Sequence, residues 1–137
     1  MRAYAKAMES YGAVQVVTGV NTANSVQLIQ MLFDGLNDSL SSARGHIQNR
    51  AIEDKSRALA RASRIVIGLQ SVLDFQRGGE LAQNLNDLYS YVTSRLFHIN
   101  AHNDLEALNE VQGLMRDIAD AWRALPGLLA DSGVGVH

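Results

Sequence analysis

From residue 24 to residue 122 the apolar residues recur every three or four positions, which is the spacing of one face of an α-helix. Three short turns divide this pattern into four segments, each long enough for a helix of about 20 residues. Amphipathic helices joined by short loops bury their apolar faces against one another. The chain is therefore predicted to be all-α, an antiparallel four-helix bundle.

Local signals set the expected boundaries of these helices. Asn24 is a good N-cap, so the first helix should open there. Glu53 places negative charge at the start of the second helix, and the third should begin near Glu80. The fourth should end before Pro126, because proline interrupts a helix. The chain then divides into an irregular N-terminal arm at residues 1–23, a bundle at 24–125 and a mobile C-terminal tail at 126–137.

The third helix follows two adjacent glycines, Gly78 and Gly79, which are expected to stop the preceding segment and to act as a structural hinge. The apolar face of this helix is predicted to be Leu81, Leu85, Leu88 and Val92. Between that face and the solvent lies a flank made of Asn84, Tyr91, Arg95 and His98. An aromatic ring on this flank is not needed for the core, so the surplus surface indicates a binding role.

Apolar surplus also appears on the first two helices. The first has Leu28 in its predicted core stripe, with Met31 and Phe33 on opposite flanks, where they leave apolar surface for a partner to cover. Gly35 interrupts this helix, which indicates a close approach by another helix or a ligand. On the second helix, Ile67 projects roughly opposite the core.

The motifs of catalysis and of metal binding are missing. There is no cysteine, which removes disulfides, zinc-thiolate sites and catalytic thiols. His98 and His102 are four residues apart, but no carboxylate partner on the other helices completes a metal site. The two glycines lack the lysine and the preceding strand of a phosphate loop. We expect no enzyme activity, no metal and no cofactor.

Charge and hydropathy exclude two further classes of partner. A net charge of -2 argues against a dedicated nucleic-acid binder. No segment approaches the ~20 apolar residues of a membrane span, so no membrane insertion is expected. The sequence favours a cytoplasmic protein that binds protein segments.

Five motifs point to one family when they are taken together: NTAN at residues 21–24, MLFDG at 31–35, SVLD at 71–74, GGELAQNLNDLYSY at 78–91 and AWR at 121–123. In this order and spacing they resemble the FliS family, the flagellin-specific export chaperones of bacterial flagella. The likeness runs from about Tyr11 to Trp122.

The sequence departs from the family pattern in a few places. Asn24-Ser25 stands where the family commonly has Ser-Pro, and Phe33 replaces a usual tyrosine. The family's N-terminal tyrosine corresponds to Tyr11 or to Tyr4, and we favour Tyr11.

The resemblance implies a small cytoplasmic chaperone that holds the C-terminal segment of flagellin. Such a chaperone prevents premature polymerisation and assists delivery of flagellin to the flagellar export machinery, and its N-terminal arm lies near the substrate groove. We expect eight residues to bind flagellin: Tyr11, Met31, Phe33, Ile67, Asn84, Leu88, Tyr91 and Arg95.

A second interpretation of the same surplus surface is self-association. In that case the protein would be a helical structural or regulatory adaptor that forms a homodimer. Light scattering separates the two: a dimer indifferent to flagellin favours the adaptor, and a monomer that takes up one flagellin tail favours the chaperone.

Overall fold

The structure is a computed structural model that describes the backbone of residues 22–132 and the side chains of residues 27–124. Most of the expected N-terminal arm, including Tyr4 and Tyr11, lies outside the described residues, as do residues 133–137. What was predicted for them stays a prediction.

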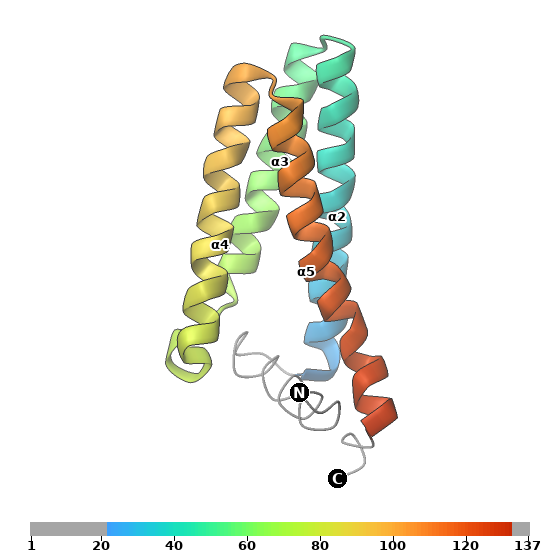
Figure 1. Ribbon diagram of the computed structural model, residues 1–137, viewed down its shortest axis with the longest axis vertical. Coiled ribbons are helices and arrows are strands. Elements are labelled where there is room, and N and C mark those ends of the chain that lie inside the picture. The colour runs from blue at the N-terminus through green and yellow to red at the C-terminus, as the bar shows by residue number, and fades with distance from the viewer. Residues whose placement is uncertain (1–21, 133–137) are drawn as a thin grey trace.

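Four α-helices make up the described chain, and they form a bundle (Figure 1). The helix α2 packs against α3 and α5, and α4 packs against the same two neighbours, so α2 and α4 lie diagonally across the bundle. Short connections make consecutive helices antiparallel, which confirms the predicted all-α four-helix bundle. The helices are α2 (Thr22–Gln48), α3 (Ile52–Ser71), α4 (Phe75–His102) and α5 (Leu105–Ser132).

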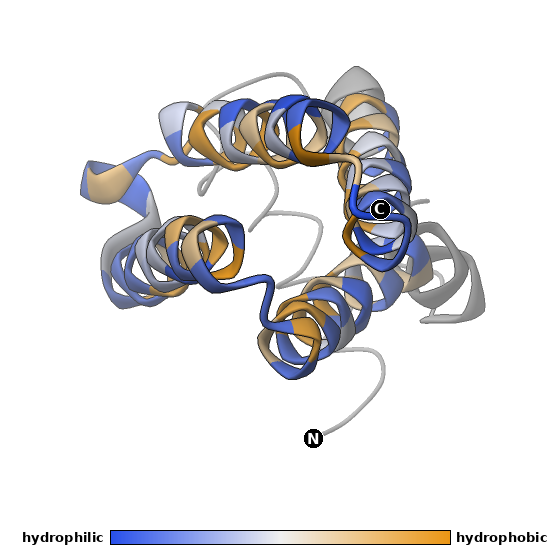
Figure 2. Cartoon of the chain, turned by 90° about the horizontal axis from the view of Figure 1, so that it is seen from above, coloured by the Kyte–Doolittle hydropathy of each residue, from blue (hydrophilic) through white to orange (hydrophobic). Residues whose placement is uncertain are grey.

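The core lies along the axis between the four helices. Seen from above, the apolar residues gather on the inward sides of the helices (Figure 2). Among the largest side chains that are fully buried are Leu36, Leu40, Leu69, Leu96, Ile99 and Leu108. Aliphatic residues at helical spacing therefore supply most of the stabilisation, as the sequence pattern predicts.

Several helix boundaries differ from prediction. The helix α2 begins at Thr22, two residues before Asn24, so Asn24 is not its N-cap. The helix α4 opens at Phe75 with one extra turn, because the Asp74 carboxylate accepts a hydrogen bond of 3.0 Å from the Arg77 amide. After a kink at Gly79 the long part of α4 starts at Glu80, as predicted. The helix α5 continues through Pro126 to Ser132 instead of ending before the proline.

The backbone of α4 leaves helical geometry at one residue, Gly79, where φ is 51° and ψ is -128°. Residues with a Cβ rarely adopt this conformation. The preceding Gly78 is still in the first helical turn, because its amide donates to the Asp74 carbonyl over 2.7 Å. Gly79 therefore sets the angle between the short opening turn and the rest of α4.

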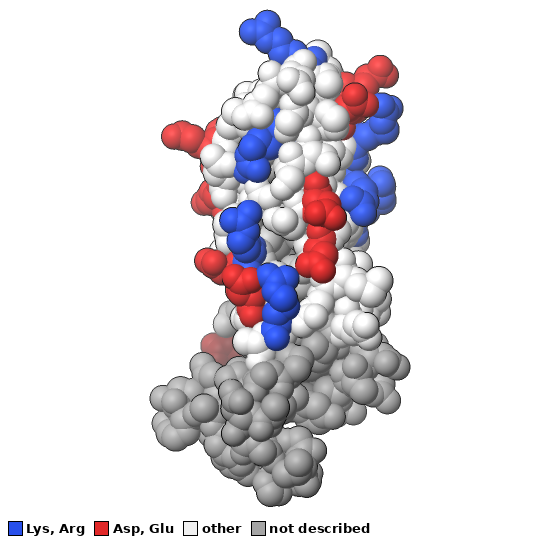
Figure 3. All heavy atoms as spheres, turned by 90° about the vertical axis from the view of Figure 1, so that its right-hand side faces the viewer, with Lys and Arg blue, Asp and Glu red and all other residues white. Residues whose placement is uncertain are grey.

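Charged side chains of both signs are mixed on the face shown in Figure 3. On the α2–α5 side of the bundle, Arg123 pairs with Asp34 and with Asp120. Within the described part of the chain, no helix combines the length and the hydropathy needed to cross a bilayer.

Candidate functional site

The flank of α4 predicted to bind a partner faces α5. The Tyr91 hydroxyl donates a hydrogen bond of 2.9 Å to the Glu110 carboxylate of α5. Arg95, one turn further along α4, brings its Nε to 3.5 Å from the other oxygen of that carboxylate. Tyr91, Arg95 and Glu110 form a polar clasp between the two helices.

Apolar residues continue from the clasp, away from the α4–α5 loop. Helical spacing places Leu88 one turn before Tyr91 and Leu114 one turn after Glu110, on the sides that the clasp fixes. Leu85, Leu88, Leu114 and Ile118 are partly buried against the core, whereas Leu81 and Tyr91 are exposed. We call this surface the α4–α5 strip; its members are Leu81, Asn84, Leu85, Leu88 and Tyr91 on α4 with Leu114 and Ile118 on α5.

The two helices diverge along the strip. From their connecting loop, α4 and α5 separate toward the other end of the bundle (Figure 1). No hydrogen bond or ion pair joins the described residues 75–90 of α4 to residues 111–124 of α5. The strip is therefore fastened at the clasp and lacks polar cross-links beyond it.

The clasp changes the pKa of its tyrosine. The hydrogen bond to Glu110 raises the pKa of the Tyr91 phenol, so the hydroxyl remains a donor. The Arg95 Nε is buried without a hydrogen-bond partner among the described residues, although Glu110 lies within ion-pair distance.

The same flank ends in a histidine pair. His98 lies 2.8 Å from the Asp104 carboxylate, and its ring centroid is 4.7 Å from that of His102. The Ala107 amide and His98 lower the pKa of Asp104 by hydrogen bonding to its carboxylate. No cluster of three or more metal-ligating side chains occurs among residues whose side chains are described.

The predicted binding residues do not all lie together. Asn84, Leu88, Tyr91 and Arg95 share the α5-facing flank of α4, with Asn84 and Tyr91 exposed and the other two half-buried. Met31 is 64% exposed on α2, and Ile67 is 53% exposed on α3. Because α2 does not contact α4, Met31 lies apart from the α4 residues of the strip.

Three expected positions are wrong. Phe33 is only 2% exposed instead of leaving apolar surface, because α5 covers that flank of α2 and brings Met115 against the same small hollow. Leu81 and Leu28, both expected in the core, are about half exposed, at 49% and 51%. On α4 the inner positions are taken instead by Ala82 and Tyr89, each adjacent in sequence to a predicted core leucine.

The partner residues on α5 were not found from the sequence. In the sequence Glu110 is one of several acidic residues in its helix, and the residues around it do not reveal its contact with Tyr91. Leu114 and Ile118 fit any amphipathic pattern. Their role depends on which flank of α5 faces α4, and that is fixed by packing.

Comparison with known proteins gives consistent matches. The family model described as "Flagellar protein FliS" matches residues 7–127. The flagellar secretion chaperone FliS of Salmonella typhimurium is 41% identical over 122 residues, covering 88% of this chain and 90% of that protein. FliS of Escherichia coli is 40% identical over 131 residues, covering 93% and 96%. FliSB of Pseudomonas aeruginosa is 39% identical over 117 residues, covering 85% and 93%.

Proposed function

Because the chain belongs to the FliS family of flagellar proteins, we propose that this flagellar secretion chaperone binds the C-terminal segment of flagellin along the α4–α5 strip. It holds the segment in the cytoplasm, keeps flagellin from polymerising before export, and helps deliver it to the flagellar export machinery. This role requires neither catalysis nor a cofactor.

The observation that carries the site assignment is the strip itself. Leucine side chains line helices that diverge, so their outward sides are available to another apolar surface. An amphipathic segment laid along the strip would gain roughly 25 cal/mol for each Å² of apolar surface removed from water. The exposed Asn84 amide makes no hydrogen bond to a described residue, and it supplies a polar contact for the bound backbone.

The chemistry of the substrate fits this surface. A flagellin tail buries apolar residues against other subunits in the filament, so before export those residues are prone to aggregate. Ordering a flexible segment costs about 2 to 5 kcal/mol, so tight binding requires a long contact. We propose that the segment extends from the strip around the bundle, where Ile67 and Met31 add contacts. Tyr11 stays a predicted contact.

The test is calorimetric titration of the full chain with a flagellin C-terminal peptide. The double variant Asn84→Ala and Tyr91→Ala is expected to bind at least about tenfold more weakly. The matched control is Phe97→Ala, because Phe97 lies on the same helix, is 77% exposed and is outside the strip. An unchanged affinity in the double variant overturns the site, and absence of binding by the unaltered chain overturns the substrate.

The exposed Phe97 favours one alternative, self-association through the other side of α4. Light scattering with and without the peptide distinguishes the two. We expect a monomer that takes up one flagellin segment, whereas a stable dimer indifferent to the peptide supports a self-associating adaptor.

A further inference from the structure

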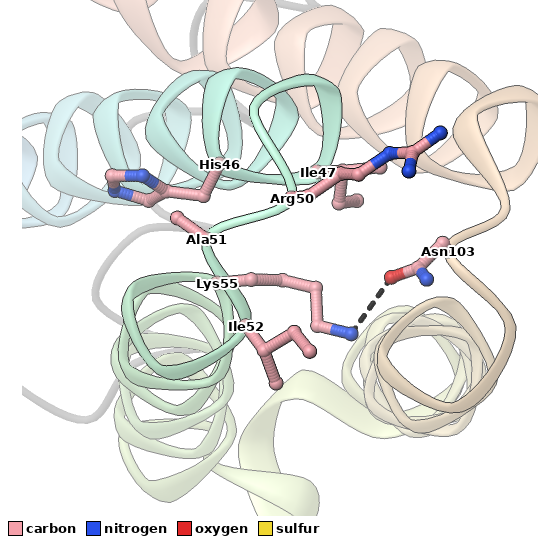
Figure 4. A pocket seen from close by; sticks show the side chains of 7 residues that line it. All are labelled: His46, Ile47, Arg50, Ala51, Ile52, Lys55 and Asn103. Carbon is pink, nitrogen blue, oxygen red and sulfur yellow. Dashed lines mark hydrogen bonds between the residues drawn. The ribbon is translucent and has the colours of Figure 1, made fainter.

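The loop end of the bundle holds a second candidate site, away from the α4–α5 strip. A hollow of about 360 Å³ opens between the α2–α3 turn and the α4–α5 turn, both at the top of Figure 1. The residues around it are His46, Ile47, Arg50, Ala51, Ile52, Lys55 and Asn103 (Figure 4). We call it the end hollow.

Lys55 is a buried cation in the end hollow, only 6% exposed. Its Nζ donates to the Asn100 carbonyl over 2.9 Å and to the Asn103 side-chain oxygen over 2.7 Å. Both acceptors are neutral, and no carboxylate pairs with Lys55 among the described residues. An ammonium group has three N–H donors, so one is left over and its charge is unbalanced.

Arg50 adds a second positive group. Its guanidinium extends toward Asn103 on the same side as Lys55, whereas the His46 imidazole extends the other way (Figure 4). No hydrogen bond or ion pair links the Arg50 side chain to a described residue. The lining of the end hollow thus includes two cations and no carboxylate.

The backbone at Arg50 suggests that the arginine has a role beyond folding. Its φ is 58°, a left-handed conformation. The Ala51 amide bonds to the His46 carbonyl and the Arg50 amide to the Ile47 carbonyl, which is the Schellman pattern at the end of α2. Glycine is the favourable residue at this position, so an arginine here is kept at a local conformational cost.

The other residues around the end hollow indicate what kind of molecule would carry the anion. Ala51, the N-cap of α3, makes no side-chain cap, so the first amides of that helix lack a side-chain acceptor. Ile47 and the exposed Ile52 supply apolar contacts on the same hollow. A ligand with a negatively charged group and an adjoining apolar group would therefore match both the cations and the isoleucines of the end hollow.

We propose that the end hollow binds the free C-terminal carboxylate of a polypeptide that ends in an apolar residue. The carboxylate lies between Lys55 and Arg50, where bidentate pairing with the guanidinium is available. The terminal apolar side chain packs on Ile47 and Ile52. This site is separate from the proposed flagellin strip, and neither proposal depends on the other.

The test is an NMR titration of the isotope-labelled full chain with N-acetyl-leucine, which is a minimal chain end. We expect millimolar binding that shifts the backbone amides of residues 50–55 and 103. N-acetyl-leucinamide, which lacks the carboxylate, should bind at least about tenfold more weakly. Equal binding of the amide overturns the proposal.

Two further titrations distinguish the proposed ligand from related anions. The α-amide of N-acetyl-glutamic acid presents a side-chain carboxylate, and inorganic phosphate presents an anion without an apolar part. Tighter binding of either than of N-acetyl-leucine overturns the assignment to an apolar chain end. Weaker binding of both supports it.

The variant Arg50→Gly distinguishes a binding role from a folding role. Glycine suits the left-handed backbone, so the melting temperature should rise while the affinity for N-acetyl-leucine falls at least about fivefold. An affinity unchanged in Arg50→Gly contradicts the proposal. This variant is preferable to a change at Lys55, which also holds the end of α4.

Discussion

The α2–α3 interface and the α4–α5 interface are built from similar amphipathic helices, but they pack differently. The contact between α2 and α3 is much more extensive than that between α4 and α5. A Cβ added at Gly35 would meet Ile65 and Arg61 at ordinary van der Waals distance, and Arg61 donates to Ser39 over 2.8 Å. On the other side, the polar contacts between described residues of α4 and α5 are confined to the half of α4 nearer the connecting loop.

This difference shows how one sequence pattern can produce two kinds of helix interface. Where two helices stay close, the apolar residues on their facing sides are buried in the core. Where they diverge, the same kind of residue is left half-covered, as Leu88 and Leu114 are. The open interface is the one to which we assign flagellin binding, because it combines apolar surface with a nearby polar clasp.

The largest expected contrast is between two leucines. Leu36→Ala in α2 should lower the free energy of unfolding by about 2 to 5 kcal/mol, because Leu36 is fully buried. Leu81→Ala on the strip should change it by no more than about 0.5 kcal/mol but weaken flagellin-peptide binding. Urea denaturation and calorimetry measure the two quantities. Similar losses of stability would show that the strip belongs to the core.

The kink at Gly79 should be sensitive to any side chain. Gly79→Ala leaves room for the methyl group but forces a Cβ residue to a φ of 51°. We expect a loss of about 1 to 2 kcal/mol in unfolding free energy. The control Gly113→Ala, in helical α5 with open space around it, should be stabilising. If both variants behaved alike, the left-handed geometry at Gly79 would be refuted.

The closed interface predicts a smaller gain at Gly35. A Cβ added there would lie 3.5 Å from both Ile65 and Arg61, an ordinary contact. Gly35→Ala should therefore stabilise the bundle by about 0.5 to 1 kcal/mol through helix propensity. Thermal unfolding tests this, and a clear destabilisation would mean that α3 approaches more closely than described.

The smallest expected effect is the pH dependence of stability that arises from Asp104, in the loop between α4 and α5. Hydrogen bonds from Ala107 and His98 lower the folded-state pKa of Asp104 below its ordinary 3.8. Its contribution is present above that value and is lost as the pH falls through the folded pKa. Asp104→Asn should flatten the acid limb of the stability curve, which is the loss of unfolding free energy as the pH falls below about 4. The change at pH 7 should be small, because asparagine keeps an oxygen that can cap the helix. An identical acid limb would contradict this.

The sequence predicted the bundle well because helical periodicity reports directly on burial. It failed where several residues compete for one face. On α4 the leucine Leu81 was expected inside, yet Ala82 and Tyr89 are buried, since the inner face is centred between the predicted positions and their neighbours. Choosing the most apolar residue at each turn cannot detect such a rotation.

Other features depend on contacts between distant segments. Whether Phe33 lies inside or outside depends on which flank of α2 receives α5. The sequence shows Lys55 only as one member of a basic helix, but the last turn of α4 and Asn103 just after it each supply an acceptor, which makes its burial tolerable. Neither outcome is encoded in local spacing.

The most direct test of the proposed flagellin-binding site uses the absence of cysteine from the sequence. Single cysteines introduced by Leu81→Cys and, as a control, Phe97→Cys can each carry a benzophenone photocrosslinker. Both positions are exposed on α4, but only the first belongs to the α4–α5 strip. We predict that a flagellin C-terminal peptide crosslinks at position 81 and not at position 97. Crosslinking confined to position 97 would contradict the assignment of flagellin to the α4–α5 strip.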